Sequence, residues 1–302
     1  MDNAVTMARG GTSQDEFDLN EYKKDCKKNN HHENFILFMD FQLHNIPPRF
    51  RTPDLYRLIQ QLGLLTVKIK VKRLCRKIQG SDSNWNALNG FYQENNGSGR
   101  IIFICDLQNP CKYCLASSGA ESKHLIIATS HHLVSNETEA DETECYLNFD
   151  GPGIQSRTLF ECQLLECDNE KDTCRLSFKL HDSQLTETLQ IALKHLKHLS
   201  VKLHKKYSKV KDEDKLCIIV AHPHGCYKYV AFGTWQKDRG NFMYDTSTCP
   251  ASSGGSVFLL GVNINDLVHM GVCETGQGCS NIIEEQDMES LIMTERIPNE
   301  NG

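Results

Sequence analysis

The chain contains a long series of apolar runs, each of strand length and separated from the next by residues that favour turns. In the run 65–72 the odd positions are apolar and the even positions are Thr or Lys. Alternation with a period of two is typical of a half-buried strand. Similar runs cover residues 100–105, 124–129, 144–149, 159–165, 174–180, 216–221, 227–235, 256–262 and 267–272. The series predicts an all-β, mostly antiparallel fold.

Two segments have helical spacing instead. Apolar residues from Leu55 to Leu62 recur at helical intervals, and Gly63 is the expected end of this short helix. In residues 183–209 apolar residues recur every three or four positions, and six Lys and three His lie between them. Asp182 stands immediately before this segment and is its expected N-cap. We therefore expect a long helical insertion that packs on the β fold and turns its basic face to solvent.

Composition excludes several classes of protein. With 39% hydrophobic and 24% charged residues, the 302-residue chain is typical of a folded globular protein. Its longest apolar stretches, such as 257–262, are far too short to cross a membrane as a helix, so we expect no membrane partner. The formal net charge of −6 lacks the basic excess of a phosphate-binding surface, so nucleic acid is not an expected partner.

The N-terminal residues predict the compartment. The chain begins Met1-Asp2-Asn3, without the basic and apolar regions of a secretory signal. This favours a cytoplasmic or nuclear location, where the fourteen Cys would be reduced thiols rather than disulfides.

The segment 249–258 carries the first chemical signal. It reads Cys-Pro-Ala-Ser-Ser-Gly-Gly-Ser-Val-Phe, and the Gly pair allows a tight turn that would expose Ser253 as a candidate nucleophile. A Ser nucleophile needs a base, and the apolar run 125–128 ends in Thr129-Ser130-His131-His132. Either His could be that base. An acid that orients it could be Asp172, at the start of the run 172–180, or the nearby Asp168.

Taken in order, these motifs resemble those of the trypsin-like (chymotrypsin-fold) serine peptidases, especially their disulfide-poor, intracellular members. The resemblance lies in the Thr129 to His132 pattern, in the strand that opens at Asp172, in the segment around Ser253 and in the chain order His, Asp, Ser. The Gly97-Ser-Gly step and the turn 221–225 are also similar to family segments. Thr129 sets the register, so His132 rather than His131 matches the catalytic His.

The resemblance implies a fold and a domain plan. We expect two antiparallel β-barrels with an active site in the cleft between them, and with residues 183–209 as a helical insertion. The peptidase domain would span residues 51–275. Residues 1–50 would be a polar, mobile leader without chemistry, and residues 276–302 an acidic tail.

The resemblance also implies roles for individual residues. Cleavage of a protein or peptide substrate would use His132, Asp172 and Ser253, without a cofactor or a metal ion. Backbone N–H groups of Ala251 and Ser253 would form the oxyanion hole. Ser247, six residues before Ser253, would lie at the base of the specificity pocket, where a neutral side chain argues against a preference for Lys or Arg.

Two departures leave an alternative open. The family has Gly at the position of Ala251, where a Cβ could hinder the turn that aims an oxyanion donor. It has Asp at the position of Ser252 in members activated by propeptide cleavage, so we expect no such activation here. An inactive peptidase-like fold that serves as a protein-binding module is therefore the alternative function.

The cysteines raise a third hypothesis. Cys105, Cys111 and Cys114 form a C-x5-C-x2-C cluster, with His124 and Cys145 nearby in the sequence. Three Cys and one further ligand could hold a structural zinc ion. A single C-x2-C pair is a weak signal, and the competing interpretation is that these are reduced, buried thiols that pack as small hydrophobic residues.

Overall fold

Two antiparallel sheets form most of the protein. The computed structural model describes residues 17–22, 24, 26–29, 32–74, 92–105, 123–209, 211–238, 241–262, 267–272 and 278–280. Each sheet contains seven described strands, and every described strand pair is antiparallel. The expectation of a mostly β, antiparallel protein is confirmed.

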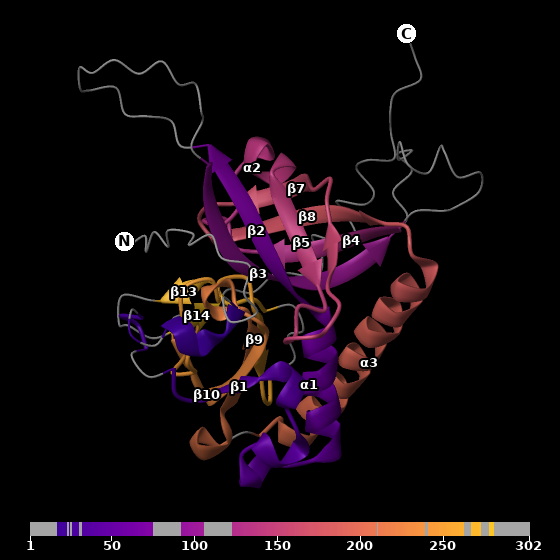
Figure 1. The fold of residues 1–302 in the computed structure, drawn as a ribbon. Helices are drawn as coiled ribbons and strands as arrows, with labels where there is room; N and C mark the ends of the chain where they lie inside the picture. Colours follow the sequence, from indigo (N-terminus) through magenta and orange to yellow (C-terminus); the bar gives the residue numbers. More distant parts are fainter. Residues whose placement is uncertain are drawn as a thin grey trace, which may run out of the picture.

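The first sheet is curled into a half-barrel (Figure 1). Its strands lie in the order β6 (Arg157–Leu159), β5 (Thr143–Leu147), β2 (Thr66–Leu74), β3 (Tyr92–Cys105), β4 (Lys123–Thr129), β8 (Thr173–Leu180) and β7 (Gln163–Asp168). The run 159–165, expected as one strand, is divided between β6 and β7. Gly99 lies in β3 against Ile69 and Ile127, where a Cβ would overlap both side chains.

The second sheet lies beside the first and carries the C-terminal half of the fold (Figure 1). Its strands lie in the order β12 (Ser256–Leu259), β9 (Leu216–Ala221), β10 (Tyr229–Asp238), β11 (Asn241–Tyr244), β14 (Gly278–Ser280) and β13 (Gly271–Val272), and β1 (Phe35–Leu37) pairs with β10. All six residues of β9 are buried. The continuous apolar sequence of β9 is therefore explained by its place in the interior of the sheet.

Three described α-helices accompany the sheets: α1 (Pro53–Leu65), α2 (Glu137–Asp141) and α3 (Ser183–Tyr207). Asp182 caps α3 as predicted, because its Oδ1 accepts a hydrogen bond from the Leu185 N–H at 2.9 Å. Helices α1 and α3 lie side by side (Figure 1), with an ion pair between Asp54 and Lys202. Their apolar faces join residues of both sheets in one core.

Gly63 does not end α1, contrary to the prediction from the sequence. The helix continues to Leu65, and Gly63 is buried inside it. The ring of Phe38 packs directly on Gly63, where a Cβ would overlap the ring. The glycine is required by close packing and not by a turn.

The boundaries of the structured part also differ from the expected ones. Described residues of the expected leader 1–50 form β1 and bury Phe41, Ile46 and Phe50 in the main core. These apolar side chains explain the packing of residues 35–50, whereas the polar composition that suggested a mobile leader belongs to residues 1–34. At the other end, Gly278–Ser280 forms β14 within the expected tail 276–302, and residues 281–302 lie outside the described part.

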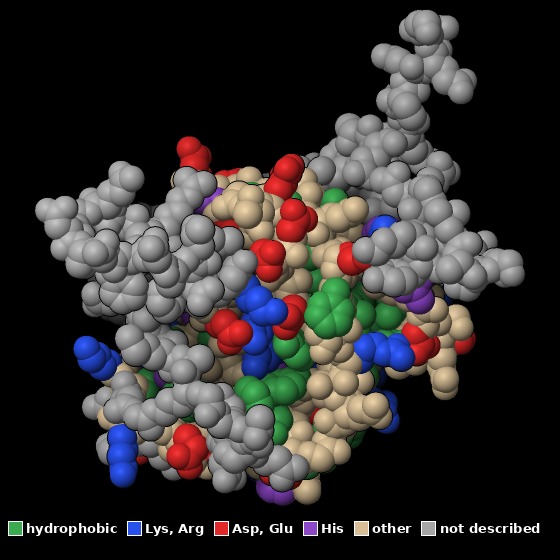
Figure 2. All heavy atoms as spheres, turned by 45° about the horizontal axis from the view of Figure 1, so that its top comes forward, with side chains coloured by type: hydrophobic (Ala, Val, Ile, Leu, Met, Phe, Trp, Pro, Cys, Tyr) green, Lys and Arg blue, Asp and Glu red, His purple; other side chains and the backbone are tan. Residues whose placement is uncertain are grey.

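The described surface carries both signs of charge. On the face shown in Figure 2, Lys and Arg side chains are bordered by Asp and Glu. In the described part of the chain, strand β2 forms the ion pairs Lys70–Glu94 and Lys72–Glu144 within the first sheet and Arg73–Glu139 with α2. Among the helices in the described part of the chain, none has the length and apolar character needed to span a bilayer.

Candidate active site

His132 and Asp172 meet at one end of the first sheet. Strands β4 and β8 are antiparallel neighbours with Thr129 opposite Cys174, so the residues just after β4 lie beside those just before β8. The His132 Nδ1 lies 2.7 Å from Asp172 Oδ2, and the His132 backbone N–H donates to Asp172 Oδ1 at 2.9 Å. Asp172 therefore fixes the position of both the ring and the backbone of His132.

The structure distinguishes between the two candidate acids and between the two candidate histidines that the sequence left as alternatives. Asp168 caps the turn that follows β7, where its Oδ1 accepts from the Lys171 N–H at 2.9 Å. His131 approaches Asp172 only through its backbone N–H, which donates to the Asp172 carbonyl oxygen. Only Asp172 and His132 are joined through their side chains, and the His132 side chain is 53% exposed.

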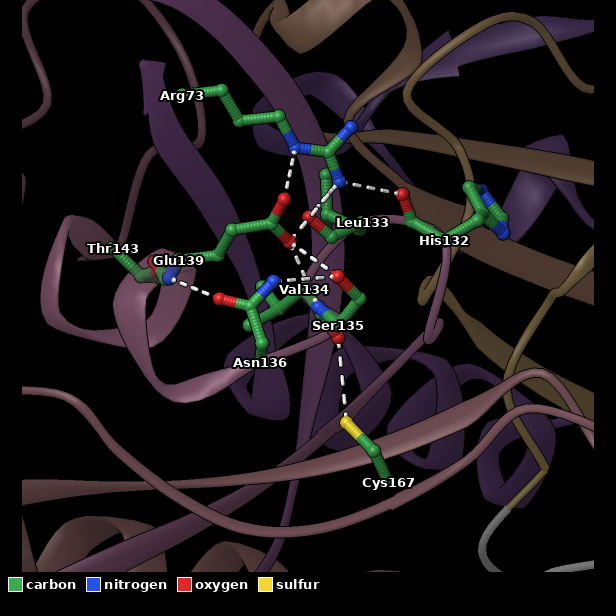
Figure 3. Close-up of polar contacts among 9 residues, drawn as sticks. All are labelled: Arg73, His132, Leu133, Val134, Ser135, Asn136, Glu139, Thr143 and Cys167. Carbon is green, nitrogen blue, oxygen red and sulfur yellow. Dashed lines mark hydrogen bonds and ion pairs between the residues drawn. The ribbon is translucent and has the colours of Figure 1, made fainter. Parts of the chain in front are cut away.

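Side chains of Arg73 and Glu139 hold the backbone at and after His132, as Figure 3 shows. The Arg73 guanidinium donates to the carbonyl oxygens of His132 and Leu133 at 2.9 and 3.0 Å. Arg73 is itself paired with Glu139, which also accepts from the N–H and hydroxyl of Ser135. The His132 ring points away from this cluster in Figure 3, so the cluster holds the backbone and leaves the ring accessible.

Ser253 lies in a turn of the second sheet that touches β3. The Ser98 N–H donates to the Ser253 carbonyl oxygen at 2.8 Å, and the Ser98 hydroxyl donates to the Ala251 carbonyl oxygen at 3.0 Å. Gly254 follows with φ +84°, and a Cβ there would overlap the Ser98 carbonyl oxygen and Thr129 Oγ1. The turn with Ser253 therefore packs against the strands that lead to His132.

His269 connects the two halves of this region. Its carbonyl oxygen accepts from the Gly254 N–H at 2.6 Å and from the Ser130 hydroxyl at 3.4 Å. Burial lowers the pKa of His269 well below its ordinary value, and the nearby charges of Lys28 and His132 act in the same direction. Its Nδ1 lies 2.6 Å from the Tyr244 hydroxyl. A neutral His269 therefore lies between the Ser253 turn and His132.

A hydrogen bond joins His132 to Asp172, but none joins Ser253 to His132 in the described structure. The Ser253 hydroxyl donates to the Met270 carbonyl oxygen at 3.2 Å, and it makes no hydrogen bond to the His132 ring in the described structure. Rotation about the Ser253 Cα–Cβ bond changes the partner of a hydroxyl without moving the backbone. The geometry is that of a formed His–Asp pair beside a Ser whose hydroxyl is engaged elsewhere.

Ala251 adopts the left-handed backbone conformation that the sequence led us to associate with Gly. Its φ is +68°, which costs an L-residue about 1–2 kcal/mol. The Cβ is thus accommodated in this turn at some cost in strain. Ser252 is buried, and its hydroxyl accepts from the Cys249 N–H at 3.1 Å, so it closes the turn instead of forming an ion pair.

The positions of the remaining predicted residues indicate little about their roles. Ser247 is half-buried in the segment between β11 and Cys249. In the proposed cysteine cluster, Cys105 ends β3 opposite His124, Cys145 is buried in β5, and Cys111 and Cys114 lie outside the described residues. Burial raises the pKa of the Cys145 thiol, as expected for a neutral packing residue.

Sequence reasoning missed several residues that shape the region. Arg73 and His269 carry no local motif of their own, since each acts through contacts with distant segments. Ser98 stands in the Gly97-Ser-Gly step noted in the sequence, but its contact with the Ser253 turn is formed with a distant segment. A hollow of about 510 Å³ lies elsewhere, between residues 18–40 and β10, and none of the three candidate residues lines it. The hollow gives no indication of the chemistry at His132.

No protein-family model matches this chain, and no curated protein is significantly similar to it in sequence.

Proposed function

We propose that this protein is a serine endopeptidase of the trypsin-like type, with two chymotrypsin-like β-barrels and an active site between them. The observation that carries the proposal is the His132–Asp172 pair, with Nδ1 to Oδ2 at 2.7 Å, next to the turn that presents Ser253. The pair orients an imidazole as a general base requires, and the chain order His, Asp, Ser agrees with this class.

The chemistry follows from the tautomer that Asp172 favours. With His132 Nδ1–H donated to Asp172, Nε2 is the nitrogen that can accept a proton. Ser253 Oγ would attack the peptide carbonyl carbon and pass its proton to His132 Nε2, and the imidazolium would then protonate the departing amine. Water would then attack the acyl-enzyme while His132 Nε2 accepts its proton, and the imidazolium would return that proton to Ser253 Oγ as the acyl group leaves. For this, the Ser253 hydroxyl must leave the Met270 carbonyl and turn toward His132.

Backbone donors would stabilise the negative charge on the attacked oxygen. The N–H groups of Ala251 and Ser253 are the proposed donors, and hydrogen bonds from Ser98 brace the carbonyl groups of both residues. Ser247 would contribute a neutral side chain to the substrate pocket. The proposed substrate is a protein or peptide, and the proposed location is cytoplasmic or nuclear.

Two observations favour a second function. The Ser253 hydroxyl is bonded to Met270 rather than to His132, and Ala251 carries backbone strain beside it. A peptidase-like fold that binds peptides without cleaving them would need neither an activated hydroxyl nor an oxyanion hole.

Covalent labelling separates the two functions. Purified protein is treated with a tagged fluorophosphonate, which reacts with an activated Ser and requires no knowledge of the substrate. We expect one label per chain, located by mass spectrometry on the peptide that contains Ser253. The Ser253→Ala variant should not be labelled, whereas Ser208→Ala, which changes an exposed hydroxyl at the end of α3, should be labelled like the wild type.

Two results would count against the peptidase. A folded wild type that takes up no label would favour the binding module. A label that persists in Ser253→Ala would place the reactive Ser elsewhere in the chain.

A further inference from the structure

Four metal-binding side chains from distant parts of the sequence meet beside the Ser253 turn. Cys26 and His32 come from the N-terminal segment, His224 from the turn Pro223–Gly225, and Cys249 from the segment before Ser253. Their ligand atoms all lie within 4.8 Å of one another, and three of the four residues are buried. We propose that these residues form a structural Cys2His2 zinc site that fastens the N-terminal segment to the Ser253 turn.

Two of the distances between ligand atoms agree with the edges of a tetrahedral zinc site. Zn–S bonds of ~2.3 Å and Zn–N bonds of ~2.05 Å imply an S···S edge of ~3.8 Å and an N···N edge of ~3.3 Å. Cys26 Sγ lies 3.6 Å from Cys249 Sγ, and His32 Nε2 lies 3.2 Å from His224 Nε2. Both pairs are therefore within about 0.2 Å of the edges that a zinc ion needs. The two sulfurs are also much farther apart than the ~2.05 Å of a disulfide.

Neighbouring groups support the ligands. The Asn29 N–H donates to Cys26 Sγ at 3.4 Å, an outer contact of the kind that orients a metal ligand. The Tyr22 ring stacks on the His224 ring with 4.8 Å between centroids, which fixes the direction of the imidazole. The Lys28 ammonium donates to Thr248 Oγ1 at 2.7 Å, which joins the N-terminal segment to the residue before Cys249. The Cys2His2 set has the composition that zinc prefers in closed structural sites.

The site would act on the turn that carries Ser253. Cys249 begins that turn, since its carbonyl oxygen accepts from the Ser252 N–H at 3.1 Å and its N–H donates to Ser252 Oγ. The His224 N–H donates to the Pro250 carbonyl oxygen at 2.6 Å, so two ligands are joined to the turn by the backbone. A zinc ion shared with Cys26 and His32 would hold the turn in place from the N-terminal side. The metal site itself does not depend on the proposed peptidase activity.

Metal content tests the site directly. The full chain is purified without a histidine tag in metal-free buffers, and zinc is measured by inductively coupled plasma mass spectrometry. Folded wild type should carry the zinc ion of this site, and Cys26→Ser and His32→Gln should each lose about one equivalent. The matched control is Cys162→Ser, which changes a buried thiol in the connection between β6 and β7 of the other sheet and should retain the metal. Circular dichroism establishes that each variant is folded.

A second readout addresses the geometry and the role. Replacement of zinc by cobalt should give a thiolate-to-cobalt charge-transfer band and the intense visible bands of tetrahedral cobalt. Removal of zinc by a chelator should increase amide hydrogen exchange in residues 249–254, and zinc should reverse the change. Exchange in β8 should not change, because β8 lies in the other sheet.

Three outcomes would overturn the proposal. The first is folded wild type without zinc, or with a Cys26–Cys249 disulfide found by peptide mapping. The second is a Cys26→Ser variant that keeps all its zinc. The third is loss of all zinc in the triple variant Cys105→Ser, Cys111→Ser and Cys114→Ser, which would assign the metal to that cluster. Metal bound as proposed, but without any change in exchange at 249–254, would overturn the role in the turn.

Discussion

Gly254 follows the candidate nucleophile Ser253 and packs directly against Ser98 of β3 in the other sheet. Its φ of +84° is left-handed, and its Cα leaves no room for a Cβ beside the Ser98 carbonyl oxygen. We expect Gly254→Ala to lower the free energy of unfolding by about 3 kcal/mol or more, because conformational strain adds to the overlap. Gly153→Ala is the matched control, since Gly153 has φ +78° but open space around it, and should cost about 1–2 kcal/mol. Equal losses in urea unfolding would contradict the close contact.

Ala251 lies three positions earlier and presents the opposite case. Because φ is +68°, Ala251→Gly relieves strain of about 1–2 kcal/mol and adds about 0.5–1 kcal/mol of entropy to the unfolded chain. We therefore expect unfolding free energy to stay the same or rise slightly. Ala192→Gly removes the same methyl group from inside α3 and should lower it by about 1 kcal/mol or more. A loss at Ala251 as large as that at Ala192 would show that the Cβ of Ala251 is not strained.

His269 predicts a pH dependence of stability. Its folded pKa is lowered by burial, so the unfolded chain binds the proton more readily. Its contribution is fully present above the ordinary His pKa of about 6.5, and it is lost as pH falls below that value at up to about 1.4 kcal/mol per pH unit. The groups facing His269 are Tyr244, Lys28 and His132.

Urea unfolding measured between pH 7 and pH 5 checks this expectation. His269→Gln should give a shallower slope than the wild type, whatever its absolute stability. His198→Gln, on the exposed face of α3, is the control for loss of an imidazole. A slope unchanged in His269→Gln would mean that His269 does not remain neutral in the folded protein.

At the scale of elements, the periodicities in the sequence predicted most strands and both long helices. The alternating run 65–72 became β2, and Asp182 starts α3 through a local hydrogen bond. Errors arose where a long-range contact overrides the local pattern. Gly63 looks like a stop signal, and only the packing of Phe38, twenty-five positions earlier in the chain, explains a glycine inside a helix.

This packing predicts an unusual effect of a helix-favouring substitution. In an exposed helix, Gly→Ala stabilises by about 1 kcal/mol. At Gly63 we expect a loss of about 1–3 kcal/mol, because the new Cβ collides with the Phe38 ring. The double variant Gly63→Ala with Phe38→Leu should recover part of this loss relative to the sum of the two single variants, as measured by thermal unfolding. Additive effects would mean that the two side chains do not meet.

At the scale of the whole molecule, the candidate site combines a part that the sequence could predict with a part that it could not. His132, Asp172 and Ser253 follow recognisable local patterns, and β4–β8 pairing brings the first two together. The choice of Asp172 over Asp168 needed the register of two strands. The four proposed zinc ligands were invisible in the sequence, because Cys26 and Cys249 are more than two hundred positions apart.

The central claim is that His132 and Asp172 act as a unit on Ser253. It is tested most directly by the rate constant of fluorophosphonate labelling in four variants. Two change the proposed catalytic residues, and two change a nearby residue of the same type as a control. We predict that His132→Ala and Asp172→Asn each lower the rate by about 10³–10⁴-fold. His131→Ala and Asp168→Asn should label within a few-fold of the wild type. Equal rates in Asp172→Asn and Asp168→Asn, or unimpaired labelling of His132→Ala, would contradict the account.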